Sequence, residues 1–367
     1  MKERLTSLDA FRGITIAGMI LVNNPGSWSH VYSPLLHAEW HGWTPTDLIF
    51  PFFLFIVGVA MTFSLFKRLE DPKDKRKIYL KIFRRAAIIY GLGLFLSGFP
   101  YFDFSTIRVV GVLQRIAIVY LIASIIILNT GIKGQAGIAV GLLFLYWGLM
   151  KLVPVPGFGA GDLSVEGNLA AYIDNKLLHG HMWKETWDPE GLLSTIPAIS
   201  TTLTGVLTGH LLRSRLDKRE IAAWMFVAGW CAIIIGLFWN ILFPINKSIW
   251  TSSYVAFTSG AALQFLGFCY WLIDVKGYKK WAHFAIIYGM NSIAVFVLSG
   301  LTARIMQLIK VDAANGNSIS LKSWVYQNLF ASWAGPLNGS LAFAVTNILF
   351  WLAMMGILYR KNIFIKI

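Results

Sequence analysis

The chain has 367 residues, of which 56% are hydrophobic and only 14% are charged, and it contains 15 Trp and 26 Phe. A soluble domain carries more charge than this, so the composition excludes an ordinary soluble protein and indicates a membrane protein. The net charge of +14 would suit a nucleic-acid-binding protein, but the basic residues gather in short loops between apolar segments. That distribution is typical of membrane topology.

Ten apolar segments are long enough to cross a membrane, because runs of about 18 or more apolar residues are typical of membrane helices. They cover residues 8–25, 46–66, 79–98, 108–129, 136–153, 192–212, 221–243, 251–273, 282–304 and 340–359. Strands of a β-barrel would alternate apolar and polar residues instead. The sequence therefore predicts an all-α polytopic membrane protein with about ten transmembrane helices, formed by one domain over residues 1–367.

The positions of lysine and arginine predict which loops face the cytoplasm. Most of the 32 basic residues fall near the two ends of the chain and in the loops 67–85, 213–219 and 276–280. By the positive-inside rule, both termini are predicted to be cytoplasmic. The basic loops are also expected to contact anionic membrane lipid. The loops predicted to face outward are 25–44, 154–191 and 305–339.

Ionisable groups in the first and fourth predicted spans are functional candidates, because charge is costly within a membrane. Asp9 and Arg12 lie three residues apart, on one face of a helix. They form either a structural ion pair or a site for an anionic ligand that arrives from the cytoplasm. Gln114 and Arg115 are predicted about a third of the way into their span from outside, where an arginine needs a partner or a ligand.

The outer loop 25–44 contains no Lys or Arg and leads into the stretch HAEWHGWTPTD, residues 37–47. Histidine titrates near neutral pH, and a neighbouring carboxylate fixes its tautomer and stabilises its charged form. His37 and Asp47 therefore suit proton abstraction from an incoming nucleophile. The alternative is a set of polar residues at the membrane interface, within a belt of tryptophans.

Other polar residues are predicted at helix ends. Asn23 closes the first span, Asn291 begins the sequence NSIAVF, and residues 246–255 read NKSIWTSSYV. Asp188-Pro189-Glu190 is typical of a helix start with proline in the first turn. Capping or hydrogen bonds between helices explain these residues as well as ligand binding does. No Cys/His cluster has zinc spacing, so we expect no metal.

Eight blocks of the sequence, in order, resemble the heparan-α-glucosaminide N-acetyltransferase family of transmembrane enzymes. They are LTSLDAFRGITIAGMILVNN, HAEWHGWTPTDLIFPFFLFIVG, RVVGVLQRIAIVYLI, AAYIDNKLL, WDPEGLLSTIPAI, NKSIWTSSYV, GMNSIAVFVL and RKNIFIKI. The resemblance implies a transmembrane acyltransferase-like bundle that moves the acetyl group of cytoplasmic acetyl-CoA to the amine of a glucosamine-type sugar on the outer side. It also implies a small bacterial version, located in the inner (plasma) membrane.

The resemblance also implies roles for particular residues. The histidine on which the family depends matches His37 rather than His41, and Asp47 and Asn23 match its aspartate and asparagine. The block LDAFRG resembles the opening motif of a broader group of membrane acyltransferases, whose arginine is associated with acyl-CoA. We therefore expect catalysis by His37, Asp47 and Asn23. Acetyl-CoA is assigned to Asp9, Arg12, Gln114, Arg115 and Asn291, and the sugar to Trp40, Asp188, Glu190, Asn246, Lys247 and Trp250.

Several alternatives stay open at this point. His37 acts either as a general base in a ternary complex or as a transiently acetylated nucleophile. Ser299 stands where the family pattern carries a histidine, which leaves the exact acceptor open. An amino-sugar transporter without chemistry and an O-acyltransferase of a cell-surface polysaccharide are the rival functions. The sequence predicts no nucleic-acid partner and leaves a homodimer open.

Overall fold

The computed structural model describes residues 5–69, 75–312 and 318–365, and only the backbone of residues 66–69. Helices dominate the described residues. Two short antiparallel hairpins accompany them, β1 (Pro154–Val155) with β2 (Gly159–Ala160) and β3 (Lys310–Asp312) with β4 (Ser318–Ser320). Parts of the predicted loops 67–85 and 305–339, namely residues 70–74 and 313–317, lie outside the description.

Each predicted span has a helix at its position. The long helices are α1 (Thr6–Asn23), α2 (Ile49–Leu69), α3 (Lys75–Gly98), α4 (Val112–Asn129), α5 (Ile132–Leu152), α7 (Thr195–Leu212), α8 (Lys218–Asn240), α9 (Ser252–Tyr270), α10 (His283–Met290), α11 (Ser292–Leu308) and α13 (Ser332–Arg360). Within the described ranges, six helices are long and apolar enough to cross a membrane, or seven if the bent pair α10–α11 is one span. The mostly helical, multi-span architecture is confirmed, whereas the number of ten spans is not.

The contacts between residues divide the chain into two compact units. Unit 1 contains residues 1–37, 44–49 and 272–366, and unit 2 contains residues 38–43 and 50–271. The chain thus passes between the units within the HAEWHGWTPTD stretch. The predicted single domain stays a prediction.

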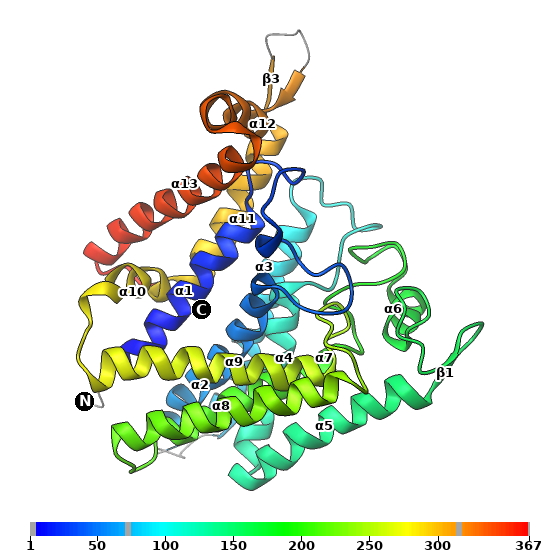
Figure 1. Ribbon diagram of the computed structural model, residues 1–367, viewed down its shortest axis with the longest axis vertical. Coiled ribbons are helices and arrows are strands. Elements are labelled where there is room, and N and C mark those ends of the chain that lie inside the picture. Colours follow the sequence, from blue (N-terminus) through cyan, green and yellow to red (C-terminus); the bar gives the residue numbers. More distant parts are fainter. Residues whose placement is uncertain (1–4, 70–74, 313–317, 366–367) are drawn as a thin grey trace. The chain divides into compact units, whose positions relative to one another are not determined.

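In unit 1, α1 and α10 pack with their backbones almost in contact (Figure 1). A Cβ atom on Gly13 would lie 1.7 Å from the carbonyl oxygen of Ala285, and one on Gly289 would lie 2.2 Å from that of Asp9. Small residues are typical of such close contacts between membrane helices. These two glycines therefore fix how closely α1 approaches α10.

The ninth predicted span is broken in the structure. α10 and α11 meet at Asn291 with a bend of 72°, and the Asn291 backbone has φ −124° and ψ 37°, outside the helical region. The prediction of one continuous span over 282–304 is wrong, because apolar composition does not reveal a break at a single polar residue.

The predicted outer loop 305–339 is largely structured. It contains the end of α11, the β3–β4 hairpin and α12 (Leu321–Tyr326), and one helical turn over Gln327–Ala331 leads into α13. Gly335 interrupts α13 with φ 76°, directly before Pro336. The polar composition of this segment predicted a loop, but α11 continues to Leu308 and α13 already begins at Ser332.

In unit 2, α8 and α9 form an antiparallel pair (Figure 1). α2 and α7 also pack closely, since a Cβ atom on Gly58 would lie 2.0 Å from the carbonyl oxygen of Thr202. The predicted outer loop 154–191 contains the β1–β2 hairpin and α6 (Leu169–Leu178). It packs over a buried cluster that includes Tyr146 and Phe243.

Candidate active site

His37 and Asp47 meet within unit 1. His37 Nδ1 lies 2.6 Å from Asp47 Oδ1. The side chain of Asp47 is 1% exposed and that of His37 is 49% exposed. A buried carboxylate at Nδ1 orients the ring and favours the tautomer with the proton on Nδ1. Nε2 is then the ring nitrogen suited to accept a proton.

Asp47 is held in place by the start of a short helix, η2 (Pro45–Leu48). This start is a capping box, in which Thr44 N donates to Asp47 Oδ2 over 2.9 Å. One carboxylate oxygen therefore serves the helix start while the other meets His37. Thr44 Oγ1 also donates to Leu36 O over 2.6 Å, beside His37. The cap and the His37 contact are thus one local structure.

The loop that leads to His37 is attached to α13. Ser27 N donates to Ser340 Oγ over 3.1 Å, and Gly26 N donates to the Ser340 carbonyl oxygen over 3.3 Å. Further along the loop, Tyr32 Oη donates to Asn338 Oδ1 over 2.5 Å. These contacts hold the loop in one conformation, which a positioned catalytic group requires.

His41 meets a different kind of partner, within unit 2. Asn246 Nδ2 lies 3.4 Å from His41 Nδ1, and Asn246 Oδ1 accepts a hydrogen bond from Ile249 N over 3.1 Å. The amide NH₂ of Asn246 therefore faces His41, whose Nδ1 must accept. Burial lowers the pKa of His41. A lowered pKa makes His41 the weaker base, and its ring lacks the carboxylate contact at Nδ1 that His37 has.

The first helix ends at Asn23, as predicted, and the side chains of Asn23 and Asn24 differ. Asn24 is buried, and its Nδ2 donates to Ile20 O over 3.0 Å. Asn23 is exposed. The catalytic role of Asn23 stays a prediction.

Asp9 and Arg12 form the predicted ion pair on α1. Arg12 Nη1 lies 3.2 Å from Asp9 Oδ1 and donates to the carbonyl oxygen of Gly289 over 3.3 Å. Gly289 lies in the last turn of α10, where a cation stabilises the helix end. The guanidinium therefore has a structural function at the helix break.

Asn291 contacts the C-terminal segment. Its Nδ2 donates to Ile363 O over 3.1 Å, and its Oδ1 accepts from Ile365 N over 2.8 Å. The residue is 1% exposed. The structure thus gives Asn291 partners within the chain, and its assignment to acetyl-CoA stays a prediction.

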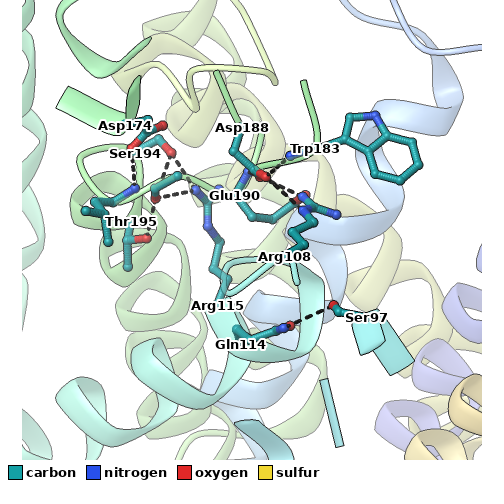
Figure 2. Close-up of polar contacts among 12 residues, drawn as sticks. Ser97, Arg108, Gln114, Arg115, Asp174, Trp183, Asp188, Glu190, Ser194 and Thr195 are labelled. Carbon is teal, nitrogen blue, oxygen red and sulfur yellow. Dashed lines mark hydrogen bonds and ion pairs between the residues drawn. The ribbon is translucent and has the colours of Figure 1, made fainter. Parts of the chain in front are cut away.

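Arg108 joins the two acidic residues that were assigned to the sugar (Figure 2). Its Nε and Nη2 donate to Asp188 over 2.8 and 2.6 Å, and Nη2 also donates to Glu190 over 2.5 Å. Burial alone would lower the pKa of Arg108, but the hydrogen bonds and charges of the two carboxylates outweigh it and raise that pKa. Both acids are buried and engaged within the protein. Both acids thus belong to an internal ion network, and their assignment to the sugar stays a prediction.

The predicted helix start at Asp188 is also wrong, because α7 begins at Thr195. Asp188 instead accepts hydrogen bonds from the backbone N–H groups of Trp183 and Glu190, over 2.7 and 2.8 Å. An aspartate that binds nearby N–H groups stabilises a turn as well as a helix start. The sequence motif alone does not distinguish the two.

Gln114 and Arg115 lie in the first turn of α4 and not a third of the way into a span, because the helix begins at Val112. Arg115 Nη2 donates to Gly191 O over 3.1 Å and to Ser194 Oγ over 2.5 Å (Figure 2). Arg115 Nε and Nη1 are buried and have no hydrogen-bond partner among the described residues. Arg115 therefore keeps donor capacity for a small ligand or water.

Asp174 is a member of this network that the sequence did not predict. It lies on α6, is 1% exposed, and accepts a hydrogen bond from Leu192 N over 2.8 Å (Figure 2). Burial raises the pKa of Asp174 to about 6. A carboxyl group with a strongly shifted pKa is typical of functional sites and of structural ion networks. The one sequence signal that could have identified Asp174 as a candidate site residue is its place in the family block AAYIDNKLL.

The remaining residues assigned to the sugar have mixed positions in unit 2. Trp250 is fully buried, donates from Nε1 to Thr201 Oγ1 over 3.1 Å and lies under the Arg115 guanidinium. Its ring is therefore part of the core of unit 2, and its assignment to the sugar stays a prediction. Trp40 is partly buried and donates to Leu163 O over 2.8 Å. Asn246 is buried and Lys247 is partly exposed in the loop before α9. No group of three metal-ligating side chains occurs among the residues that the structure describes.

Comparison with known proteins decides the family. A family model described as heparan-alpha-glucosaminide N-acetyltransferase, catalytic, matches residues 4–239. The chain belongs to this family. It is 29% identical over 431 residues to the human heparan-alpha-glucosaminide N-acetyltransferase, with all of the chain and 60% of the relative covered. It is 30% identical over 354 residues to the mouse protein of that name, with 80% of the chain and 53% of the relative covered.

The match confirms the resemblance predicted from the eight sequence blocks. The region matched by the catalytic model of the family includes His37, Asp47 and the ion network around Arg108. Asn291 and the C-terminal segment lie beyond it. The chain spans little more than half the length of these relatives.

Proposed function

We propose that the chain is a transmembrane N-acetyltransferase that moves the acetyl group of acetyl-CoA to the amine of a glucosamine-type sugar. The observation that carries this proposal is the contact of 2.6 Å between His37 Nδ1 and Asp47 Oδ1, in a family whose relatives are named N-acetyltransferases. The half-exposed histidine and the buried carboxylate are what a positioned general base requires.

The proposed reaction is a single transfer in a ternary complex. The neutral amine of the sugar attacks the thioester carbonyl, a C–N bond forms, and the carbon–sulfur bond breaks. His37 Nε2 takes the proton from the attacking nitrogen, and Asp47 stabilises the resulting imidazolium. The proton then passes to the leaving thiolate to give CoA. We propose Asn23 as a donor to the developing oxyanion, once bound substrate covers its exposed amide.

Substrate-binding residues are proposed for each unit by itself. In unit 1, Arg12, oriented by Asp9, suits a phosphate or carbonyl group of acetyl-CoA. In unit 2, Arg115 offers two buried donors that have no hydrogen-bond partner among the described residues. The rings of Trp28 and Trp43 are 58% and 43% exposed and present flat faces to a sugar. With both termini in the cytoplasm, acetyl-CoA would enter from that side and the sugar from the other.

The test is acetyl transfer by the purified protein in lipid nanodiscs. The protein is incubated with acetyl-CoA labelled in the acetyl group and with a panel of amino sugars, and mass spectrometry identifies the product and its linkage. We expect an N-acetylated sugar, and a loss of at least about 100-fold in turnover for His37→Gln. His41→Gln is the matched control and should retain activity.

The rival functions give different results in the same assay. A transporter would move labelled sugar across a vesicle membrane without forming a product. An O-acyltransferase would give an ester that hydroxylamine cleaves. Labelled acetyl-His37 without acceptor would support the two-step route instead of the ternary complex. Turnover of His37→Gln within twofold of wild type would remove His37 from the mechanism.

A further inference from the structure

The C-terminal segment of the chain is bound at the break between α10 and α11. Asn291 Nδ2 donates to Ile363 O and Asn291 Oδ1 accepts from Ile365 N, so the side-chain amide pairs with two backbone groups in the way that a neighbouring strand would. Asn291 is 1% exposed, whereas Ile363 and Ile365 are 45% and 48% exposed. An exposed segment thus satisfies a buried amide.

The segment is shaped for this contact by the end of α13. Asn362 has φ 54°, and the N–H groups of Asn362 and Ile363 donate to the carbonyls of Tyr359 and Leu358 over 3.0 and 2.9 Å. This is a Schellman motif with asparagine in the left-handed position. The chain therefore turns back at a defined point, and its next residues reach Asn291.

The other side of the break is bound by α1. Arg12 Nη1 donates to Gly289 O, two residues before Asn291, and the Gly289 backbone lies against Asp9. Glycine at 289 allows this close approach, because a Cβ atom there would lie 2.2 Å from Asp9 O. The break between α10 and α11 is therefore contacted from two sides. Arg12 binds the carbonyl of Gly289 before the break, and the C-terminal segment binds Asn291 at the break.

We propose that Asn291 and the backbone of residues 363–365 form a positioning device that sets Arg12, through Gly289, for binding acetyl-CoA. This inference rests on the proposed function. Without the two hydrogen bonds, the buried amide loses its partners and the bend of 72° is no longer fixed. The Gly289 carbonyl then moves, and Arg12 loses this hydrogen bond while it keeps its contact with Asp9. Asn291 thus affects acetyl-CoA binding by positioning Arg12, and does not itself contact the coenzyme.

Two substitutions remove the contact from opposite sides. Asn291→Leu keeps the size of the side chain but loses both hydrogen bonds. Ile365→Pro removes the single N–H that donates to Asn291. Ile365→Ala keeps that N–H and is the matched control. Melting curves and gel filtration in detergent confirm that each variant is folded.

The readouts are acetyl-CoA affinity by calorimetry and steady-state kinetics. We expect Asn291→Leu and Ile365→Pro each to weaken acetyl-CoA binding about tenfold, the loss of roughly one charged contact, with kcat within about twofold of wild type. The double variant should bind no more weakly than Asn291→Leu alone, because that substitution already removes the hydrogen bond that Ile365→Pro deletes. Hydrogen exchange over residues 284–295 should be faster in both variants, and Ile365→Ala should match wild type.

Unchanged acetyl-CoA affinity in both folded variants would overturn the inference, as would losses that multiply in the double variant. A wild-type protein that neither binds acetyl-CoA nor transfers acetyl groups would instead refute the proposed function. In that case hydrogen exchange decides whether the C-terminal segment holds the break, and exchange equal to wild type would reject it.

Discussion

Replacement of Asp174 by asparagine tests the buried ion network most directly. The pKa of Asp174 is raised to about 6 by burial, from the value of 3.8 for a free carboxyl. The folded protein therefore holds this proton more tightly than the unfolded chain. The stability that the group contributes is fully present below about pH 4 and is lost as the pH rises through 6. A shift of this size corresponds to about 3 kcal/mol of unfolding free energy, of which about half is lost between pH 5 and 7.5.

Asp174→Asn keeps an oxygen that can accept from Leu192 N but carries no charge at any pH. We expect the variant to be more stable than wild type at pH 7.5, and its advantage to shrink by about half at pH 5. The measurement is thermal unfolding in detergent, followed by tryptophan fluorescence from pH 5 to 7.5.

The control is Asp162→Asn, in the same predicted outer loop 154–191. Hydrogen bonds from Ser164 lower the pKa of Asp162, so this group stays charged throughout the range. The effect of Asp162→Asn should therefore not depend on pH. A pH-independent effect of Asp174→Asn, or a variant less stable than wild type at pH 7.5, would refute the argument and show that the carboxylate is stabilised in its charged form.

Three further predictions address packing, coenzyme binding and topology. Gly289→Ala places a methyl group 2.2 Å from Asp9 O. This clash should push α1 and α10 apart and lower the melting temperature sharply. An unchanged melting temperature would contradict the close packing of the two helices. Arg12→Ala should raise KM for acetyl-CoA and not only lower kcat, because a charged hydrogen bond is lost; normal CoA binding would leave Arg12 with its structural function alone. With both native cysteines replaced, Glu166→Cys should react with an impermeant maleimide on intact cells and Asp74→Cys should not, whereas the reverse pattern would invert the proposed topology.

The positions of the helices could be predicted from sequence because lipid selects for long apolar runs, whatever their neighbours. The break at Asn291 could not, because it depends on hydrogen bonds to residues 72 and 74 positions away. A lone asparagine in an apolar run is also compatible with a straight helix whose polar group meets another helix. Local composition carries no information about such a partner.

In the candidate site too, contacts between residues close in the sequence could be predicted, and contacts between distant residues could not. His37 and Asp47 are ten residues apart, and the complementary chemistry of an imidazole and a carboxylate is enough to suggest the couple. Arg108 meets Asp188 across 80 residues and two loops, so neither residue identifies the other in the sequence. Trp250 stands among polar residues in the sequence NKSIWTSSYV, which gives no sign that its side chain is fully buried or that its backbone has φ 51°.

Burial of charge is costly, so the ion network of unit 2 calls for an explanation other than stability. Buried charges lose their hydration, and apolar residues of similar size often stabilise a protein equally well or better. Hydrogen bonds are directional, whereas apolar contacts are not. Those from Arg108 and Arg115 connect the start of α4 to the turn before α7. Trp40 packs against Trp187, the residue before Asp188. We therefore interpret the network as fixing the arrangement of the start of α4 and the turn before α7 within unit 2.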